Sequence, residues 1–94
     1  MMQSEEFTGK VVLVTGASQG IGLEICRQFS ELGATIISVA RNEEKLELAR
    51  NSIKNNTNVY PYSCDLSVKA EIEKLFDFVE EKFQRIDVLV NNLG

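Results

Sequence analysis

Three glycines, Gly16, Gly20 and Gly22, follow a short run of aliphatic residues from Val11 to Val14. Such a run, ended by a glycine, predicts a strand that is buried on both faces. An amphipathic helical pattern begins directly after the glycines. Because the N–H groups and the dipole at a helix N-terminus attract anions, and glycine lets an anion approach the backbone, we expect residues 16–22 to bind the phosphates of a dinucleotide. A glycine turn that binds nothing is the structural alternative.

The spacing of these glycines differs from the common dinucleotide fingerprint G-x-G-x-x-G, and no Gly-Lys-Ser/Thr follows as in a P-loop. With Thr15, the pattern Gly16-x-x-x-Gly20-x-Gly22 resembles the opening T-G-x-x-x-G-x-G of the short-chain dehydrogenase/reductase family. Phe7-Thr8-Gly9-Lys10 is similar to the lead-in of that family. The candidate cofactor-binding residues of the loop are Gly16, Ser18, Gln19, Gly20, Ile21 and Gly22.

The residues after the second predicted strand bear on the choice of cofactor. Proteins that prefer NAD usually carry an acidic residue about 20 positions beyond the glycine turn, where it holds the 2′-hydroxyl of the adenosine ribose. In the family register this position is Ala40, which cannot do so. The guanidinium of Arg41 can instead pair with a 2′-phosphate, and Asn42 can add a hydrogen bond. We therefore predict that the protein binds NADP(H) in preference to NAD(H). Many members of the family have Arg or Lys where this chain has Gln19, and without that second positive charge the preference should be weaker. The alternative is that Arg41 only begins a solvated helix.

Two later segments also match the family. Asp65-Leu66 resembles its adenine contact, in which the carboxylate accepts a hydrogen bond from the exocyclic amine; stabilising the N-terminus of the next helix is an equally good account. Asn91-Asn92-Leu93-Gly94 resembles Asn-Asn-Ala-Gly, which supports the central sheet beside the cofactor ribose, although Leu93 replaces the alanine. An asparagine-rich turn is the alternative there. The resemblance adds Asp65, Leu66, Asn91 and Gly94 to the candidate cofactor-binding residues and covers the chain from Phe7 to Gly94.

No catalytic residue is predicted. The family uses Tyr-x-x-x-Lys with an upstream serine, the tyrosine as general acid or base and the lysine to lower its pKa. Tyr60 is followed four residues later by Cys64, and Tyr62 by Leu66. We therefore interpret residues 1–94 as the single, N-terminal NADP-binding half of a short-chain oxidoreductase, inactive alone because the catalytic half is absent. The intact enzyme would transfer hydride between nicotinamide and a carbonyl or alcohol carbon.

Seven predicted elements position these residues after a loose tail over residues 1–8. Strands are predicted over residues 10–15, 35–40, 59–63 and 86–90. Helices are predicted over residues 21–32, from an Asn42 cap, and from a Ser67 cap to residue 83, and the first should bury Ile21, Ile25, Phe29 and Leu32. This order predicts a partial three-layer α-β-α Rossmann-type parallel sheet with strand order 3-2-1-4. Pro61 agrees, because a proline favours a sheet edge.

Composition narrows the function further. Ninety-four residues allow one small domain, and the net charge of −4 argues against nonspecific nucleic-acid binding. Histidine is absent, and Cys26 and Cys64 lack CxxC spacing, so we expect no metal site, reduced thiols and a cytoplasmic location. Residues 1–6 lack the apolar core of a signal peptide, and no run is long enough to span a membrane.

Two other functions remain open from the sequence. The chain is alternatively a complete, non-catalytic nucleotide-binding or interaction module that docks a partner through the fourth strand. That strand, Val88-Leu89-Val90, is apolar and would be an exposed edge, so we also expect self-association or pairing with the missing half. A flavin or S-adenosylmethionine site on a similar sheet fits the glycine spacing and Arg41 less well.

Overall fold

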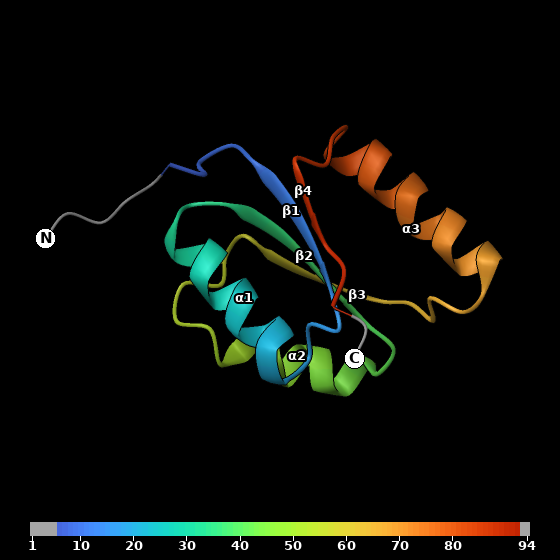
Figure 1. The fold of residues 1–94 in the computed structure, drawn as a ribbon, viewed down its shortest axis with the longest axis horizontal. Helices are drawn as coiled ribbons and strands as arrows, with labels where there is room; N and C mark the ends of the chain where they lie inside the picture. The colour runs from blue at the N-terminus through green and yellow to red at the C-terminus, as the bar shows by residue number, and fades with distance from the viewer. Residues whose placement is uncertain (1–5, 93–94) are drawn as a thin grey trace, which may run out of the picture.

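The computed structural model describes residues 6–92, in which strands and helices alternate along the chain (Figure 1). The strands are β1 (Val11–Thr15), β2 (Thr35–Ala40), β3 (Val59–Ser63) and β4 (Val88–Val90), and the helices are α1 (Gly20–Glu31), α2 (Glu43–Asn51) and α3 (Lys69–Lys82). All strands pair in parallel, in the order β3-β2-β1-β4. This confirms the predicted order, with the proline-containing β3 at one edge. The chain adds β2 and β3 on one side of β1 and then crosses to add β4 on the other side. The carboxyl ends of β1 and β4 therefore meet at a topological switch point.

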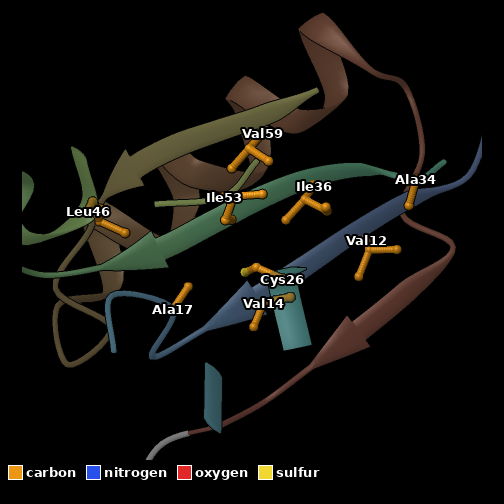
Figure 2. Close-up of a cluster of buried hydrophobic side chains, with 9 residues drawn as sticks. All are labelled: Val12, Val14, Ala17, Cys26, Ala34, Ile36, Leu46, Ile53 and Val59. Carbon is orange, nitrogen blue, oxygen red and sulfur yellow. The ribbon is translucent and has the colours of Figure 1, made fainter. Parts of the chain in front are cut away.

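Alternation along each strand divides the core between two faces of the sheet. One cluster holds Val12 and Val14 of β1 and lies under α1 and α2, which contribute Cys26 and Leu46 (Figure 2). The other cluster, on the opposite face, lies under Leu75 and Val79 of α3. Figure 1 shows α1 and α2 on one side of the sheet and α3 on the other. The described residues therefore form the expected three layers of a partial Rossmann-type fold.

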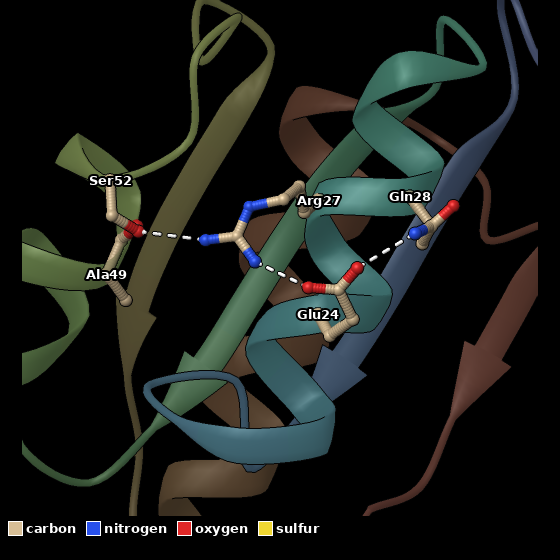
Figure 3. A network of polar contacts seen from close by, with 5 residues as sticks. All are labelled: Glu24, Arg27, Gln28, Ala49 and Ser52. Atoms are coloured by element: carbon tan, nitrogen blue, oxygen red, sulfur yellow. Dashed lines mark hydrogen bonds and ion pairs between the residues drawn. The ribbon is translucent and has the colours of Figure 1, made fainter.

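A surface network joins α1 to the end of α2 (Figure 3). Arg27 donates to Glu24 at 2.6 Å and to the Ser52 hydroxyl at 3.4 Å, while Gln28 donates to the other oxygen of Glu24 at 2.8 Å. These hydrogen bonds lower the pKa of Glu24, with Gln28 the largest contributor. Because these groups meet solvent, water screens the ion pair between Arg27 and Glu24, which therefore adds little to stability.

The structure corrects the predicted buried face of α1. Ile21 is 72% exposed, and the residues that the helix buries are Gly22, Cys26 and Ser30. Ile25 and Phe29 pack beside this line and are partly buried. The rotation follows from Gly22, which must face the preceding loop because the helix approaches that loop too closely for any side chain.

The loose tail predicted over residues 1–8 is wrong for its last part. The N–H of Phe7 donates to the carbonyl of Leu32 at 3.0 Å. Its ring packs edge-on against Phe29, with the centroids 5.0 Å apart. Residues 1–5 lie outside the described residues. Phe7 therefore attaches the segment before β1 to the C-terminal end of α1.

The sequence predicts the N-cap residue of α2 correctly but not that of α3. Asn42 caps α2 as expected, since its side-chain oxygen accepts from the N–H of Lys45 at 2.9 Å. The predicted Ser67 cap of α3 is wrong: Val68 is the N-cap, and no side chain caps the helix there. Ser67 instead donates its hydroxyl to Asp65 at 2.7 Å. The Ser67 hydroxyl therefore forms its hydrogen bond within the turn that precedes α3 and not with an N–H group of the helix.

Helical spacing in the sequence predicts that α3 buries a stripe made of Val68, Ile72, Leu75, Phe76, Val79 and Phe83. The stripe that the structure buries is narrower. Leu75 and Val79 are buried, whereas Val68 and Phe76 remain 39% and 44% exposed. Phe78 packs on Tyr62, and Phe83 packs on Tyr60 of β3. The aromatic residues at the C-terminal end of α3 therefore pack against β3.

Candidate functional site

The loop between β1 and α1 lies at the switch point, as predicted. Gly16 and Gly20 adopt φ angles of +61° and +59°, a left-handed conformation that favours glycine. A Cβ at Gly20 would have no atom within 4 Å, so the backbone there is open to a ligand. The loop is also fixed from the sheet side, because the N–H of Ala17 donates to the carbonyl of Val39 at 3.1 Å.

Gly16 and Gly22 serve a different purpose from Gly20, namely close packing. A Cβ on Gly22 would overlap the carbonyl group of Gly16, and a Cβ on Gly16 would overlap the backbone oxygen of Asn92. The amide of Asn92 also donates to the carbonyl of Gly16 at 3.4 Å. These contacts bring the start of α1 against β1 and the end of β4, so the loop has little freedom apart from its open side.

A hydroxyl that the candidate list omitted connects the glycine loop to the end of β4. The N–H of Asn92 donates to the Thr15 hydroxyl at 2.8 Å. That hydroxyl lies 3.2 Å from the side-chain oxygen of Asn91 and 3.4 Å from the carbonyl of Val90, and it donates its proton toward this pair. Sequence reasoning named Asn91 but missed Thr15 and Asn92, although both stand in the motifs that it quoted. Gly94, the remaining candidate here, lies outside the described residues.

The remaining candidate residues of the β1–α1 loop are Ser18, Gln19 and Ile21, which lie on its solvent side. Gln19 is the N-cap residue of α1 and is exposed, but its side chain makes no capping hydrogen bond. Ser18 is half-buried, and Ile21 projects into solvent at the first turn of the helix. The first turn carries no acidic residue, so nothing of like charge opposes an anion at this helix end.

A hollow of about 410 Å³ opens beside the loop, between the ends of β2 and β3. Its lining combines small or apolar groups with one basic and one acidic side chain: Gly16, Ala40, Arg41, Cys64, Asp65, Leu66 and Ser67. It therefore brings together residues from three separate segments that were predicted to contact the cofactor. A larger hollow lies near the amino ends of β2 and β3, beside Gly33 and Asn55, and includes none of the candidate residues.

Arg41 lies at the rim of this hollow directly after β2, and Asn42 is the next residue along the chain. Both are exposed, and the backbone carbonyl of Arg41 accepts a hydrogen bond from the Ser63 hydroxyl at 2.8 Å. The side-chain oxygen of Asn42 is engaged in capping α2. Only the amide NH₂ of Asn42 is therefore available to a ligand, which suits a phosphate oxygen.

Asp65 forms the turn that leads into α3. One of its carboxylate oxygens accepts from the N–H and the hydroxyl of Ser67, at 3.0 and 2.7 Å. These bonds, with a smaller contribution from the charge of Arg41, lower the pKa of Asp65. Its own N–H donates to the Glu71 carboxylate in the first turn of α3, at 2.8 Å. The turn before α3 is thus held in place, and the second oxygen of Asp65 can still accept a hydrogen bond from a ligand.

The rings of both tyrosines contact side chains of the α3 segment. Tyr60 lies under the ammonium of Lys82, 5.3 Å from the ring centroid, and Tyr62 packs on Phe78. Both tyrosines belong to β3 and pack against α3. Within residues 6–92, no group of three or more His, Cys, Asp or Glu residues is arranged to hold a metal ion. Among the same residues, no helix has the length and apolar character needed to cross a membrane.

A parallel sheet with a glycine loop and a polar-rimmed hollow at its switch point defines the class of Rossmann-type α/β proteins. A family model described as short chain dehydrogenase matches residues 10–94. The chain belongs to this family.

Known relatives agree with this assignment. The chain is 36% identical over 92 residues to farnesol dehydrogenase of Aedes aegypti, covering 96% of this chain and 38% of that protein. It is 37% identical over 93 residues to dehydrogenase/reductase SDR family member 11 of Gallus gallus, covering 96% of this chain and 36% of that protein. It thus spans well under half the length of these relatives.

Solved structures show the same fold. L-sorbose reductase of Gluconobacter frateurii, in complex with NADPH and L-sorbose, has a TM-score of 0.87 and 34% identity, covering 100% of this chain and 36% of that one. A metagenomic short-chain oxidoreductase in complex with NADP has a TM-score of 0.87 and 39% identity, covering 94% of this chain and 40% of that one.

Proposed function

We propose that this chain is the NADP(H)-binding portion of a longer short-chain oxidoreductase. The observation that carries the proposal is the position of three features around one switch point: the open backbone at Gly20, the hollow between β2 and β3, and Arg41 at its rim. The proposal is supported by family membership and by the two similar structures that contain NADP or NADPH.

The pyrophosphate, the adenine and the 2′-phosphate of NADP(H) each have a counterpart in this site. The backbone at Gly20 and the start of α1 suit the pyrophosphate. Leu66 and the free oxygen of Asp65 suit the adenine ring and its amine. Arg41 and the amide of Asn42 suit the 2′-phosphate. The nicotinamide would supply or accept hydride, and this chain's residues would bind and orient the cofactor.

The longer protein would move hydride between the nicotinamide and a carbonyl or alcohol carbon. The chain's share of its relatives' length supports a further portion that carries the acid–base residues. Leu89 of β4 is 57% exposed, which supports pairing of this strand with that portion. We also propose a cytoplasmic location, because both cysteines are free thiols, as is usual in reducing compartments. Imaging the tagged intact protein tests the location.

A cofactor titration tests the central proposal. The dissociation constants of NADPH and NADH are measured by calorimetry on the intact protein encoded by the reading frame. A charge-assisted contact of about 1.5–3 kcal/mol predicts that NADPH binds about ten- to a hundredfold more tightly than NADH.

Two arginine variants locate that preference. Arg41→Ala should remove it by weakening NADPH alone. Arg27→Ala, which removes an equal charge on the outer side of α1, is the control and should leave both constants unchanged. Equal constants in the wild type would contradict the NADP preference, and absence of binding to either cofactor would contradict the nucleotide site itself.

A further inference from the structure

The last residue of β3 fixes the backbone around Arg41. Ser63 pairs with Ala40 in the sheet, and its hydroxyl donates to the carbonyl of Arg41 at 2.8 Å. The next N–H in the chain, that of Cys64, donates to the carbonyl of Ala40 at 2.9 Å. The end of β3 therefore holds two successive carbonyl groups, those of residues 40 and 41.

The residue after Arg41 is fixed as well. The side-chain oxygen of Asn42 accepts from Lys45 at 2.9 Å, and its backbone carbonyl accepts from Leu46 at 3.0 Å. Because a peptide group is planar, holding the carbonyl of residue 41 and capping α2 at residue 42 together fix the peptide plane between them. The direction in which the Arg41 side chain leaves the backbone is thereby restricted.

The side chain of Arg41 has no comparable support of its own. It is exposed, and within residues 6–92 no side chain or carbonyl forms a hydrogen bond or ion pair with its guanidinium. Its position at the rim of the hollow, which Asp65 also lines, therefore depends on the main chain from which it extends. Arginine has many rotamers, so an ordered starting point reduces the entropy lost when the guanidinium binds a phosphate.

We propose that Ser63 is a positioning residue for cofactor specificity, which holds the main chain of Arg41 so that its guanidinium meets the 2′-phosphate of NADP(H). This inference rests on the proposed function. Ser63 itself does not contact the cofactor in this proposal. A residue that merely stabilises the sheet would affect the binding of both cofactors, whereas Ser63 should affect only the binding of NADP(H), which carries the 2′-phosphate.

The test measures dissociation constants of NADPH and NADH for the intact protein and its Ser63 variants. Loss of one neutral hydrogen bond predicts that Ser63→Ala weakens NADPH binding by about three- to tenfold and leaves NADH binding unchanged. Ser63→Thr retains the hydroxyl and should restore the wild-type ratio of the two constants. Ser63→Cys, which keeps the size but is a weak donor, should resemble Ser63→Ala and provides a second variant if the alanine protein folds poorly.

A matched control separates the effect on Arg41 from the general loss of a serine. Ser52 also donates its hydroxyl to a backbone carbonyl, that of Ala49, at 2.7 Å, but it lies at the far end of α2. Ser52→Ala should leave the ratio of the constants unchanged. In an Arg41→Ala background, Ser63→Ala should have no further effect on the ratio, since Ser63 acts through Arg41.

Three outcomes would overturn the inference. An unchanged ratio in Ser63→Ala would show that the bond does not position Arg41. Equal weakening of both cofactors would assign Ser63 a structural role only. A further loss in the Arg41→Ala background would show that it acts by another route. A wild-type protein with no preference for NADPH would instead refute the proposed cofactor preference, and Ser63 would then have no specificity to set.

Discussion

The glycines of the β1–α1 loop divide into two kinds at the scale of single residues. Gly16 and Gly22 are required by packing, because a Cβ on either would overlap backbone atoms, and Gly16 is left-handed as well. Gly20 is required by its left-handed conformation and leaves the surface in front of it open. One motif therefore contains two physical roles, the first for the fold and the second for the ligand.

Alanine substitutions should separate these roles. Gly22→Ala forces the backbone of Gly16 to move and should lower the free energy of unfolding by about 3 kcal/mol. Gly20→Ala incurs only the left-handed penalty of about 1 kcal/mol, but its methyl group projects where a phosphate would approach. Chemical denaturation and NADPH titration of both variants measure these effects. Equal loss of stability in the two variants would contradict the assignment.

The two thiols should be unreactive in the folded protein. Cys26 and Cys64 are 1% and 2% exposed. Burial raises the pKa of Cys26 to about 12, and burial followed by the charges of Glu71 and Asp65 raises the pKa of Cys64. Since the thiolate is the nucleophile, labelling by iodoacetamide should be slow and should rise little between pH 7 and 9.

Mass spectrometry with and without denaturant checks this expectation. Both thiols should label rapidly once the chain is unfolded. Rapid labelling of Cys64 alone in the native protein would show that the end of β3 opens, which would also weaken the argument for a fixed hollow beside it.

At the scale of elements, Asp87 connects the start of β4 to the start of β1. Its N–H donates to the carbonyl of Val11 at 2.8 Å, and its carboxylate accepts from the N–H of Val11 at 2.8 Å. The other carboxylate oxygen accepts from Arg85 at 2.6 Å. Hydrogen bonds from Arg85 and then Val11 lower the pKa of Asp87.

The lowered pKa gives a pH dependence of definite sign. The stabilisation by Asp87 is fully present above the unfolded pKa of about 3.9 and is lost as pH falls through the lower folded value. The difference in Tm between the wild type and Asp87→Asn should therefore be largest near pH 7 and shrink below about pH 4. Thermal melts followed by circular dichroism measure it. A difference that stays constant from pH 7 to pH 2 would contradict this role.

At the scale of the whole molecule, β4 is one of the two edge strands of the described sheet, and β3, which contains Pro61, is the other. β4 pairs only with β1 among the described strands. Leu89 lies on the same face of the sheet as Leu13, and α3 leaves it 57% exposed. An edge with free N–H and carbonyl groups beside an apolar side chain is a site for pairing with another strand. The 94-residue chain expressed alone should therefore self-associate.

A charge on this edge should oppose that association. Leu89→Lys places an ammonium group at the exposed position and should shift the 94-residue chain toward monomer, because charged side chains block edge pairing. Leu48→Lys on α2, whose leucine is 70% exposed and lies away from the sheet edge, is the control and should leave association unchanged. Sedimentation velocity over a range of concentrations measures both. A wild-type chain that remains monomeric at all concentrations would contradict the expectation.

Local patterns in the sequence were sufficient for the elements, the strand order and the cap at Asn42. Each of these depends on interactions between near neighbours or on strong rules of topology: alternating β and α patterns, right-handed crossovers, and an edge position for Pro61. The glycine loop, Arg41 and Asp65 could likewise be named because chain order places them after successive parallel strands.

Only the tertiary structure decided how distant segments constrain one another. The orientation of α1 is set by the contact of Gly22 with Gly16, which outweighs the apolar preference of Ile21. Ser67 donates its hydroxyl to Asp65 and does not cap α3. Ser63 donates its hydroxyl from β3 to the carbonyl of Arg41, which follows the neighbouring strand β2. These contacts join residues through backbone geometry, and neither composition nor periodicity records where a carbonyl of another strand will lie.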